Sequence, residues 1–423
     1  MPLIISTTSV FPDNYKPEVY IGVTVGVGAS VGAALMVAFP PKSSHLTVLL
    51  LTLAASVILL VAEVVITPLD TGILSTQARF GLVLAVIFVA TVVQNVGGGA
   101  LYNFVGKHFP KFGVQGAQSG GTFAFVVTFI TRCISKGSFQ YLQDKDKGFR
   151  LSGYLLVALV DLLILVACCL ITILRAHVRQ SMHAKRFNTT DIECVEDTEY
   201  NENQPLLTGD EFRQFSTVSR KKVIKNNWTA LTTICLTLLI NSSLHPGITS
   251  QFHGNYNCTF ATNDLSNSSN FLNTATAVSP TRGLQSSDKT GWFIVILFGC
   301  YSVSQVIGKI LPIFGILYNK KSILCNCLVE LVIAIPILLI YFEPCIAVLQ
   351  ADWVAYLTVG LLGLVISYGM CAAMMLLSPG QRGNKQEEAL ATSMGYMSLQ
   401  LGVLLGMGVS LFLVNFVFKA IKP

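Results

Sequence analysis

The chain has 423 residues, of which 52% are hydrophobic and only 12% are charged, about half of the roughly 25% charge that is typical of soluble domains. This composition excludes an ordinary water-soluble protein. Of the 28 basic and 22 acidic residues, seventeen lie between Arg175 and Lys225, so the rest of the chain is more apolar still. A net charge of +6 without a basic stripe also argues against nucleic-acid binding.

Ten apolar windows follow one another along the chain, each long enough to cross the hydrocarbon core of a membrane as a helix. They cover residues 20–40, 46–67, 80–105, 113–134, 152–175, 228–249, 291–315, 322–343, 353–377 and 391–418. The sequence therefore predicts an all-α integral membrane protein, a polytopic helical bundle of about ten spans held in a lipid bilayer.

A polar segment divides these spans into five and five. It has acidic residues in its middle and basic residues at both ends, a composition typical of a largely disordered loop on the cytoplasmic side. Alternation of the spans then places both termini outside. The predicted organisation is a short external N-terminal segment 1–19, an N-terminal bundle 20–175, a cytoplasmic loop 176–227, a C-terminal bundle 228–418 with an external loop 250–290, and a tail 419–423.

The predicted external loop carries two glycosylation sequons, at Asn257 and Asn267. Asn188 and Asn227 form sequons on the predicted inside, which speaks against the orientation. The eleven cysteines lie mostly in apolar runs, where they act as small hydrophobic residues. One disulfide between the loop residues Cys258 and Cys345 stays an open alternative.

Motifs for nucleotide, dinucleotide or zinc binding do not occur in the sequence, and neither does a cluster of His and Cys ligands. We therefore expect no enzymatic activity, no cofactor and no metal. Transport of a solute along its gradient needs none of this equipment.

Four ionisable residues lie away from the ends of the predicted spans: Glu63, Asp161, Lys309 and Glu330. An ionisable group inside a membrane is costly, so it must face a partner or water. Lys309 is the strongest candidate, because the spacing from Gln305 stacks the two polar side chains on one helix face.

Ser302 lies one turn before Gln305 on the same predicted face. This line of donors and acceptors suits a neutral, hydrogen-bonding solute such as a nucleobase or a sugar. The alternative is structural: Lys309 extends to the membrane surface or pairs with Glu330. Glu63, Asp161 and Glu330 are candidates for proton or ion coupling.

Two stretches place helix breakers at membrane depth, where irregular backbone is tolerated if it lines a cavity. Gln94 and Asn95 precede three glycines, and Pro246 follows His245; ordinary kinks are the alternative. GxxxG spacings at residues 22–32 and 402–406 predict close helix packing.

The chain resembles the equilibrative nucleoside transporter family from the first window onward. The residues that carry the resemblance are Pro110 followed by Ser119-Gly120, the turn His245-Pro246-Gly247, Tyr301-Ser302 with Gln305 and Gly308-Lys309, and, further on, Tyr368-Gly369, Pro379, Glu387-Glu388-Ala389 and Leu401-Gly402 with Gly406 and Ser410. The resemblance implies an eleven-span, major-facilitator-like fold of two bundles, here without its first span. Either the sequence is a shortened gene model or part of the site is lost.

The resemblance also implies site residues. Gln305 and Lys309 stand where the family has an Asp and an Arg that are implicated in ribose recognition, and Lys lacks the two-pronged geometry of Arg. Gln94 or Asn95 would contact the base. Pro246, Gly308, Gly369, Ser119 and Gly120 would serve conformational change.

The expected function is facilitative transport of nucleosides or nucleobases by alternating access, with the plasma membrane as the expected location. Transport of another small polar solute is one alternative, and a transport-inactive membrane scaffold is another. An acidic dileucine pattern that ends in Leu206-Leu207 raises an endosomal or vacuolar membrane as a further possibility.

Overall fold

The computed structural model describes residues 17–39, 45–66, 75–108, 112–139, 151, 154–155, 157–173, 176, 220–245, 248–249, 252, 292–342, 348–349, 351–377 and 385–413, and within these residues the regular structure is helical. The helices are α2 (Pro17–Ala38), α3 (His45–Ile66), α4 (Thr76–His108), α5 (Phe112–Phe139), α8 (Arg220–Leu244), α9 (Trp292–Ile310), the 3-10 turn η4 (Leu311–Ile313), α10 (Cys325–Phe342), α11 (Asp352–Leu377) and α12 (Lys385–Phe412). An unlabelled apolar helix covers Val157–Ile173.

Eight of these helices are long and apolar enough to cross a membrane: α2, α3, α4, α8, α9, α10, α11 and α12. This confirms the prediction of a multi-pass membrane protein. A helix lies in each of the ten predicted windows, but α5 and Val157–Ile173 fall outside the eight. The count of ten spans stays a prediction.

Many hydroxyl groups inside the helices form hydrogen bonds within their own helix. Thr91, Thr233 and Thr358 each donate a hydrogen bond to the backbone carbonyl four residues earlier, at 2.6–2.8 Å. Such bonds make Ser and Thr tolerable in lipid, because they give the hydroxyl group a partner within its own helix. This explains how helices with many hydroxyl side chains remain compatible with a membrane.

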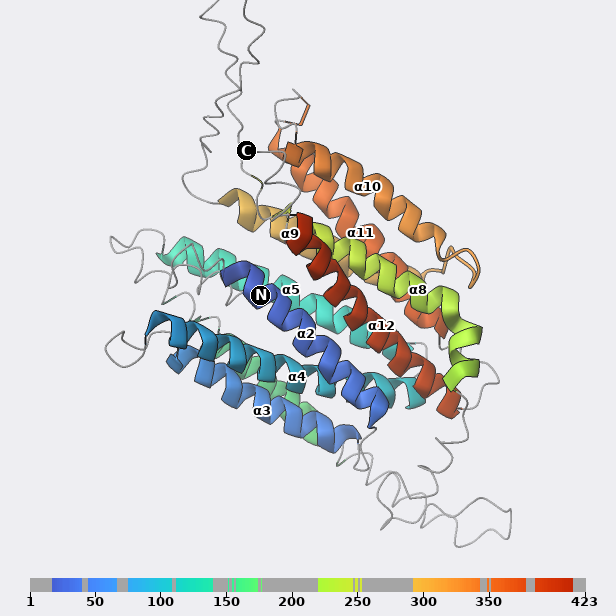
Figure 1. Ribbon diagram of the computed structural model, residues 1–423, viewed down its shortest axis with the longest axis horizontal. Helices are drawn as coiled ribbons and strands as arrows, with labels where there is room; N and C mark the ends of the chain where they lie inside the picture. The colour runs from blue at the N-terminus through green and yellow to red at the C-terminus, as the bar shows by residue number, and fades with distance from the viewer. Residues whose placement is uncertain are drawn as a thin grey trace, which may run out of the picture.

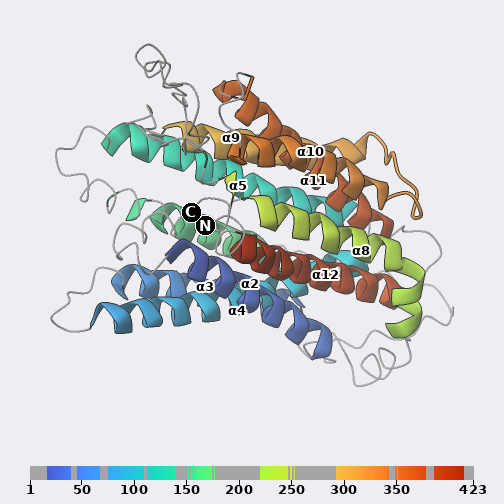
Figure 2. The same cartoon turned by 45° about the horizontal axis from the view of Figure 1, so that its top comes forward.

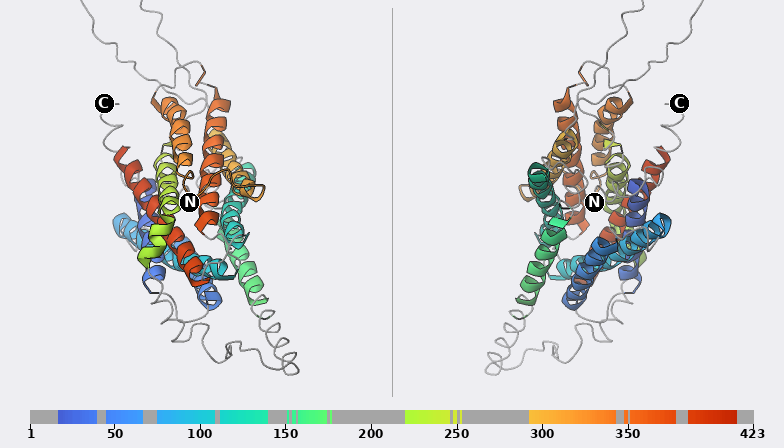
Figure 3. Two further views of the ribbon diagram at one scale, coloured as in Figure 1. Left: turned by 90° about the vertical axis from the view of Figure 1, so that its right-hand side faces the viewer. Right: turned by 90° about the vertical axis from the view of Figure 1, so that its left-hand side faces the viewer.

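The helices form two groups. α2, α3 and α4 pack together, and α8 to α11 pack together, while α12 lies between α2 and α8 (Figure 1, Figure 2). α5 packs mainly along α9. The helix Val157–Ile173 lies on the side of the molecule away from α2 and α12 (Figure 3).

The described residues form three hydrophobic cores. The largest, which we call the joint core, combines both groups of helices: it contains Ala33, Tyr102, Val105, Val114, Val223, Ala230, Leu231, Ile234, Ile323, Tyr368, Ala372, Ala373, Met374, Leu377, Leu390, Ala391, Met394 and Tyr396. It lies where α2, α4, α9 and α11 end and where α5, α8, α10 and α12 begin. We call this end of the molecule the joint end.

At the opposite end the two groups have separate cores. One core is built around Phe293, Leu297, Ile337 and Leu362 and draws on α8 to α11. The other is built around Ile21, Phe80 and Val83, from α2 and α4. The two groups therefore share a core at one end only.

The predicted glycine seams are confirmed. Gly26 of α2 packs on Leu404 of α12, whereas Gly32 on another face of α2 packs on the Val92 carbonyl of α4. Gly402 and Gly406 of α12 pack on backbone carbonyls of α8. The absence of side chains at these positions lets α2 and α12 approach their neighbours closely.

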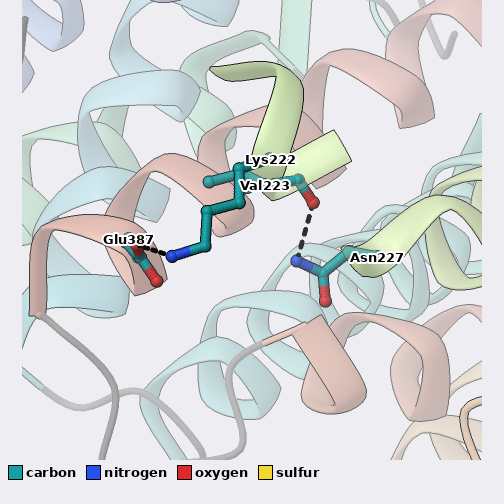
Figure 4. A network of polar contacts seen from close by, with 4 residues as sticks. All are labelled: Lys222, Val223, Asn227 and Glu387. Atoms are coloured by element: carbon teal, nitrogen blue, oxygen red, sulfur yellow. Dashed lines mark hydrogen bonds and ion pairs between the residues drawn. The ribbon is translucent and has the colours of Figure 1, made fainter. Parts of the chain in front are cut away.

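Charged and amide side chains fix the joint end of α8. Lys222 forms an ion pair with Glu387 of α12 at 3.6 Å, and the Asn227 amide donates to the Val223 carbonyl at 3.0 Å (Figure 4). The Asn227 side-chain oxygen accepts a hydrogen bond from Lys320 at 3.1 Å. Both ends of the Asn227 amide are thus engaged within the bundle.

Candidate functional site: polar clusters between the helices

Gln305 and Lys309 lie one turn apart on α9 but contact different partners. The Gln305 side-chain nitrogen donates a hydrogen bond to the Tyr301 hydroxyl at 2.7 Å. Lys309 Nζ donates to the backbone carbonyl of Gln118 on α5 at 2.9 Å. Ser302 is buried, and its hydroxyl donates to the Phe298 carbonyl at 2.8 Å. In this state the three predicted residues do not converge on one point.

Lys309 joins α9 to α5. It is only 7% exposed, so it does not reach the membrane surface. The Gln115 side chain returns a bond by donating to the Lys309 carbonyl at 3.0 Å. Glu330 is not a partner of Lys309 among the described contacts, since its hydrogen bonds come from other side chains. The lysine therefore takes part in a reciprocal link between the two helices.

A cluster of aromatic and amide side chains lies between α8 and α9. The Tyr301 hydroxyl donates to the side-chain oxygen of Asn241 and accepts from Gln305. The His245 ring lies 3.8 Å from the Tyr301 ring and 4.8 Å from the Phe298 ring, centre to centre. We call Asn241, His245, Phe298, Tyr301 and Gln305 the α8–α9 cluster.

The sequence interpretation missed Asn241 and gave Tyr301 no role beyond its place in a motif. His245 directly follows the last residue of α8, and its backbone nitrogen still bonds to the carbonyl of Asn241 four residues earlier, which places the two residues on one helix face. That spacing was a usable signal. The stacking of His245 on an aromatic residue of another helix had no signal in the sequence.

Asn95 contacts α12. Its side-chain oxygen accepts a hydrogen bond from the Tyr396 hydroxyl at 2.6 Å, and its nitrogen donates to the Thr91 carbonyl at 2.8 Å. The Tyr396 ring stacks on the Tyr102 ring, with centres 4.9 Å apart. Gln94, the neighbouring candidate, is exposed. Asn95 is thus occupied by a contact between α4 and α12.

The acidic candidates differ in their surroundings. Glu330 is completely buried and accepts hydrogen bonds from Thr237 at 2.9 Å and from Asn326. Asp161 is only partly buried on the helix Val157–Ile173, and one of its oxygens has no partner among the described residues. Glu63 lies in α3, but its side chain is outside the described part of the chain.

The conformational candidates also fall into distinct settings. Gly308 lies against the Leu364 carbonyl, and Gly369 lies against the Asn326 side chain. Ser119 is half-buried, and Gly120 is exposed with open space where a Cβ would be. Gly308 and Gly369 therefore serve close packing in this state.

Several predicted residues lie outside the described part of the chain. They are Pro110, Pro246, Gly247, Pro379, the sequons at Asn188, Asn257 and Asn267, Cys258, Cys345, and Leu206-Leu207. Within the residues that the structure describes, His, Cys, Asp and Glu side chains do not gather into a group that could hold a metal ion. Searches against protein-family models and against curated proteins each found no match.

Proposed function

We propose that the protein is a facilitative transporter of nucleosides or nucleobases that works by alternating access, with a major-facilitator-like pair of bundles. The observation that carries the proposal is the joint core at one end combined with separate cores at the other. Alternating access needs two halves that can close against each other first at one end and then at the other. Such a change is possible because packed interfaces have discrete alternative arrangements.

Two seams support a rocking motion of this kind. α2 and α12 meet over residues 22–30 of α2, at Gly22 and Met407, at Gly26 and Leu404, and through the bond from Ser30 to the Gln400 carbonyl. α5 and α9 meet through Lys309, through Phe129 on Gly299, and through Lys136 over Trp292. The α5–α9 seam spans the whole of α9, and a seam of this kind can act as a hinge while other contacts between the groups form and break.

Unlike these two seams, the contact between α4 and α12 is confined to one end of the molecule. It joins Asn95, Tyr102 and Gly106 to the first half of α12, at Tyr396 and Thr392. These residues lie toward the joint end. We assign this contact the role of the gate that must open for release on that side.

The composition of the α8–α9 cluster suits the binding of a neutral, planar solute. Its members are aromatic rings and carboxamides, groups that stack on a base and exchange hydrogen bonds with it. Carboxamides carry both a donor and an acceptor, so they suit the edges of a nucleobase or the hydroxyls of ribose. The assignment to nucleosides in particular rests on the resemblance in motif order.

Uptake into proteoliposomes tests the proposal. Purified protein is reconstituted, and entry of radiolabelled adenosine and hypoxanthine is followed against empty vesicles. We expect the internal concentration to rise to the external one and no further. Accumulation above the external concentration contradicts facilitative transport, and no uptake of either compound contradicts the proposed substrate class.

Variants on α9 locate the site. Tyr301→Phe removes the hydroxyl between Asn241 and Gln305, and Gln305→Ala removes the amide; each should raise KM about tenfold, which corresponds to about 1.4 kcal/mol. Ser302→Ala is the matched control, because the Ser302 hydroxyl is already bound within its own helix. Unchanged KM in both test variants removes this cluster from the site. The plasma membrane remains the expected location.

A further inference from the structure

Glu330 lies near the start of α10 and is the most enclosed acid that the structure describes, with none of its surface exposed. Its Oε1 accepts hydrogen bonds from the Thr237 hydroxyl of α8 at 2.9 Å and from the Asn326 amide one turn earlier on α10. Its Oε2 is buried without a hydrogen-bond partner. The two oxygens of one carboxyl group therefore have unlike surroundings.

No cation compensates a charge at this position within the described part of the chain. Lys309, the basic residue of the neighbouring α9, is bound to Gln118. Among the described residues, the titratable groups that interact electrostatically with Glu330 are Cys327 of α10, Tyr301 of α9 and Tyr318 of the segment before α10. α8 offers Thr237, which does not titrate, and α11 contributes the Val365 carbonyl, which accepts from Asn326 at 3.4 Å.

An ionised carboxylate in these surroundings would be strongly unfavourable, because a buried charge needs a counter-charge or a full set of donors. A protonated carboxyl fits better. Oε1 is then the carbonyl oxygen that accepts two hydrogen bonds, and Oε2 is a hydroxyl. A hydroxyl without an acceptor costs far less than an unpaired buried charge.

The position of Glu330 connects three helices. Thr237 belongs to α8, and the Asn326 side chain that binds Glu330 rests against Gly369 of α11. Thr237 also lies one turn from Asn241, on the face of α8 that carries the α8–α9 cluster. A change of charge at Glu330 therefore acts on the packing of α8, α10 and α11 beside the proposed solute site.

We propose that Glu330 is a proton-binding site: it holds one proton in the state described here, and it releases that proton only in a state that admits water to its carboxyl group. Proton binding then favours this state over the alternative one, as any ligand favours the state that binds it better. The consequence for solute flux rests on the proposed transport function, whereas the proton site itself does not.

Infrared spectroscopy of the purified full chain tests the site without any transport. A buried protonated carboxyl gives its own C=O stretching band, separate from the carboxylate bands. At neutral pH we expect such a band in the wild type and in Glu388→Gln, a variant of an acid near the start of α12, and its loss in Glu330→Gln. Thr237→Val should shift the band, because Oε1 loses one donor. If the wild type and Glu330→Gln show the same bands in this region of the spectrum, the proposal is overturned.

Uptake measured across a range of pH tests the coupling. Glu330→Gln keeps the shape of the protonated side chain. Its rate of uptake should therefore lose the pH dependence that the wild type shows. Glu388→Gln, at an acid near the start of α12, is the matched control and should keep the pH dependence of uptake. Two outcomes overturn the coupling. One is that uptake by Glu330→Gln depends on pH as it does in the wild type, and the other is that uptake by the wild type does not depend on pH. Absence of uptake in every protein refutes the proposed function, while the infrared band still decides the proton site.

Discussion

The hydroxyl of Tyr396 donates a hydrogen bond to the side-chain oxygen of Asn95, 2.6 Å away, and so joins α12 to α4. The two residues come from opposite parts of the chain, and the Tyr396 ring also stacks on Tyr102. One phenol therefore contributes both a directional bond and an apolar contact to the region where the two groups of helices meet.

Tyr396→Phe should loosen this contact without removing the ring stacking. A hydrogen bond of this kind contributes about 0.5–1.5 kcal/mol, so we expect faster hydrogen–deuterium exchange in the second half of α4 and the first half of α12. Tyr20→Phe is the control, since the Tyr20 ring is largely exposed. Exchange rates in α4 that match the wild type would show that the hydroxyl does not hold the contact.

Gly406→Ala should destabilise the protein, and Gly408→Ala should not. A Cβ at Gly406 would press on the Leu239 carbonyl of α8, whereas a Cβ at Gly408 meets open space. Forcing an extra methyl into a packed contact costs about 1–3 kcal/mol, and Ala is otherwise the better helix former. Thermal unfolding in detergent measures both variants. Equal melting temperatures would contradict the packing at Gly406.

Lys309→Met should change the rate of transport more than KM. The amine is bound to the Gln118 carbonyl, which also accepts from Thr122 at 3.3 Å, so Met leaves no buried acceptor without a donor. The fold should therefore survive, while the seam between α5 and α9 becomes weaker.

Initial rates of adenosine uptake over a range of concentrations measure this effect in proteoliposomes. Lys309→Arg keeps the positive charge but not the shape of the side chain, and serves as the comparison. A large rise in KM with an unchanged maximal rate would instead assign Lys309 to solute binding.

Gly369→Ala should destabilise the C-terminal group of helices through Asn326. A Cβ at Gly369 would collide with the Asn326 amide, which donates to Glu330 and so would have to move. We expect a loss of about 1–3 kcal/mol. The loss should be smaller in an Asn326→Ala background, because the colliding amide is then absent. Additive losses in the double variant, measured by thermal unfolding, would argue against this contact.

Hydropathy and small-residue spacing predicted much of the framework. Long apolar windows specify helices because the backbone must satisfy its own hydrogen bonds in lipid, and Gly26 and Gly402 lie in seams for the reason that their spacing indicated. These features depend on residues that are close together in the sequence. Local patterns are therefore sufficient to find them.

The partners of the polar residues could not be predicted in the same way. Lys309 binds a backbone carbonyl of α5, and every residue has a carbonyl, so no side chain in the sequence marks the partner. Glu330 and Asp161 gave the same signal, an acid within an apolar window. Only the neighbours contributed by other helices show that Glu330 is enclosed and that Asp161 is partly exposed.

The joint core draws on residues from Ala33 to Tyr396, so it cannot be completed until α12 has left the ribosome and entered the membrane. The separate cores at the other end need only one group of helices each. Assembly therefore includes the docking of the two groups of helices at the joint end. Two polypeptides made by cutting the chain between Arg175 and Arg220 retain the parts needed for that docking, and should find each other when they are produced in one cell.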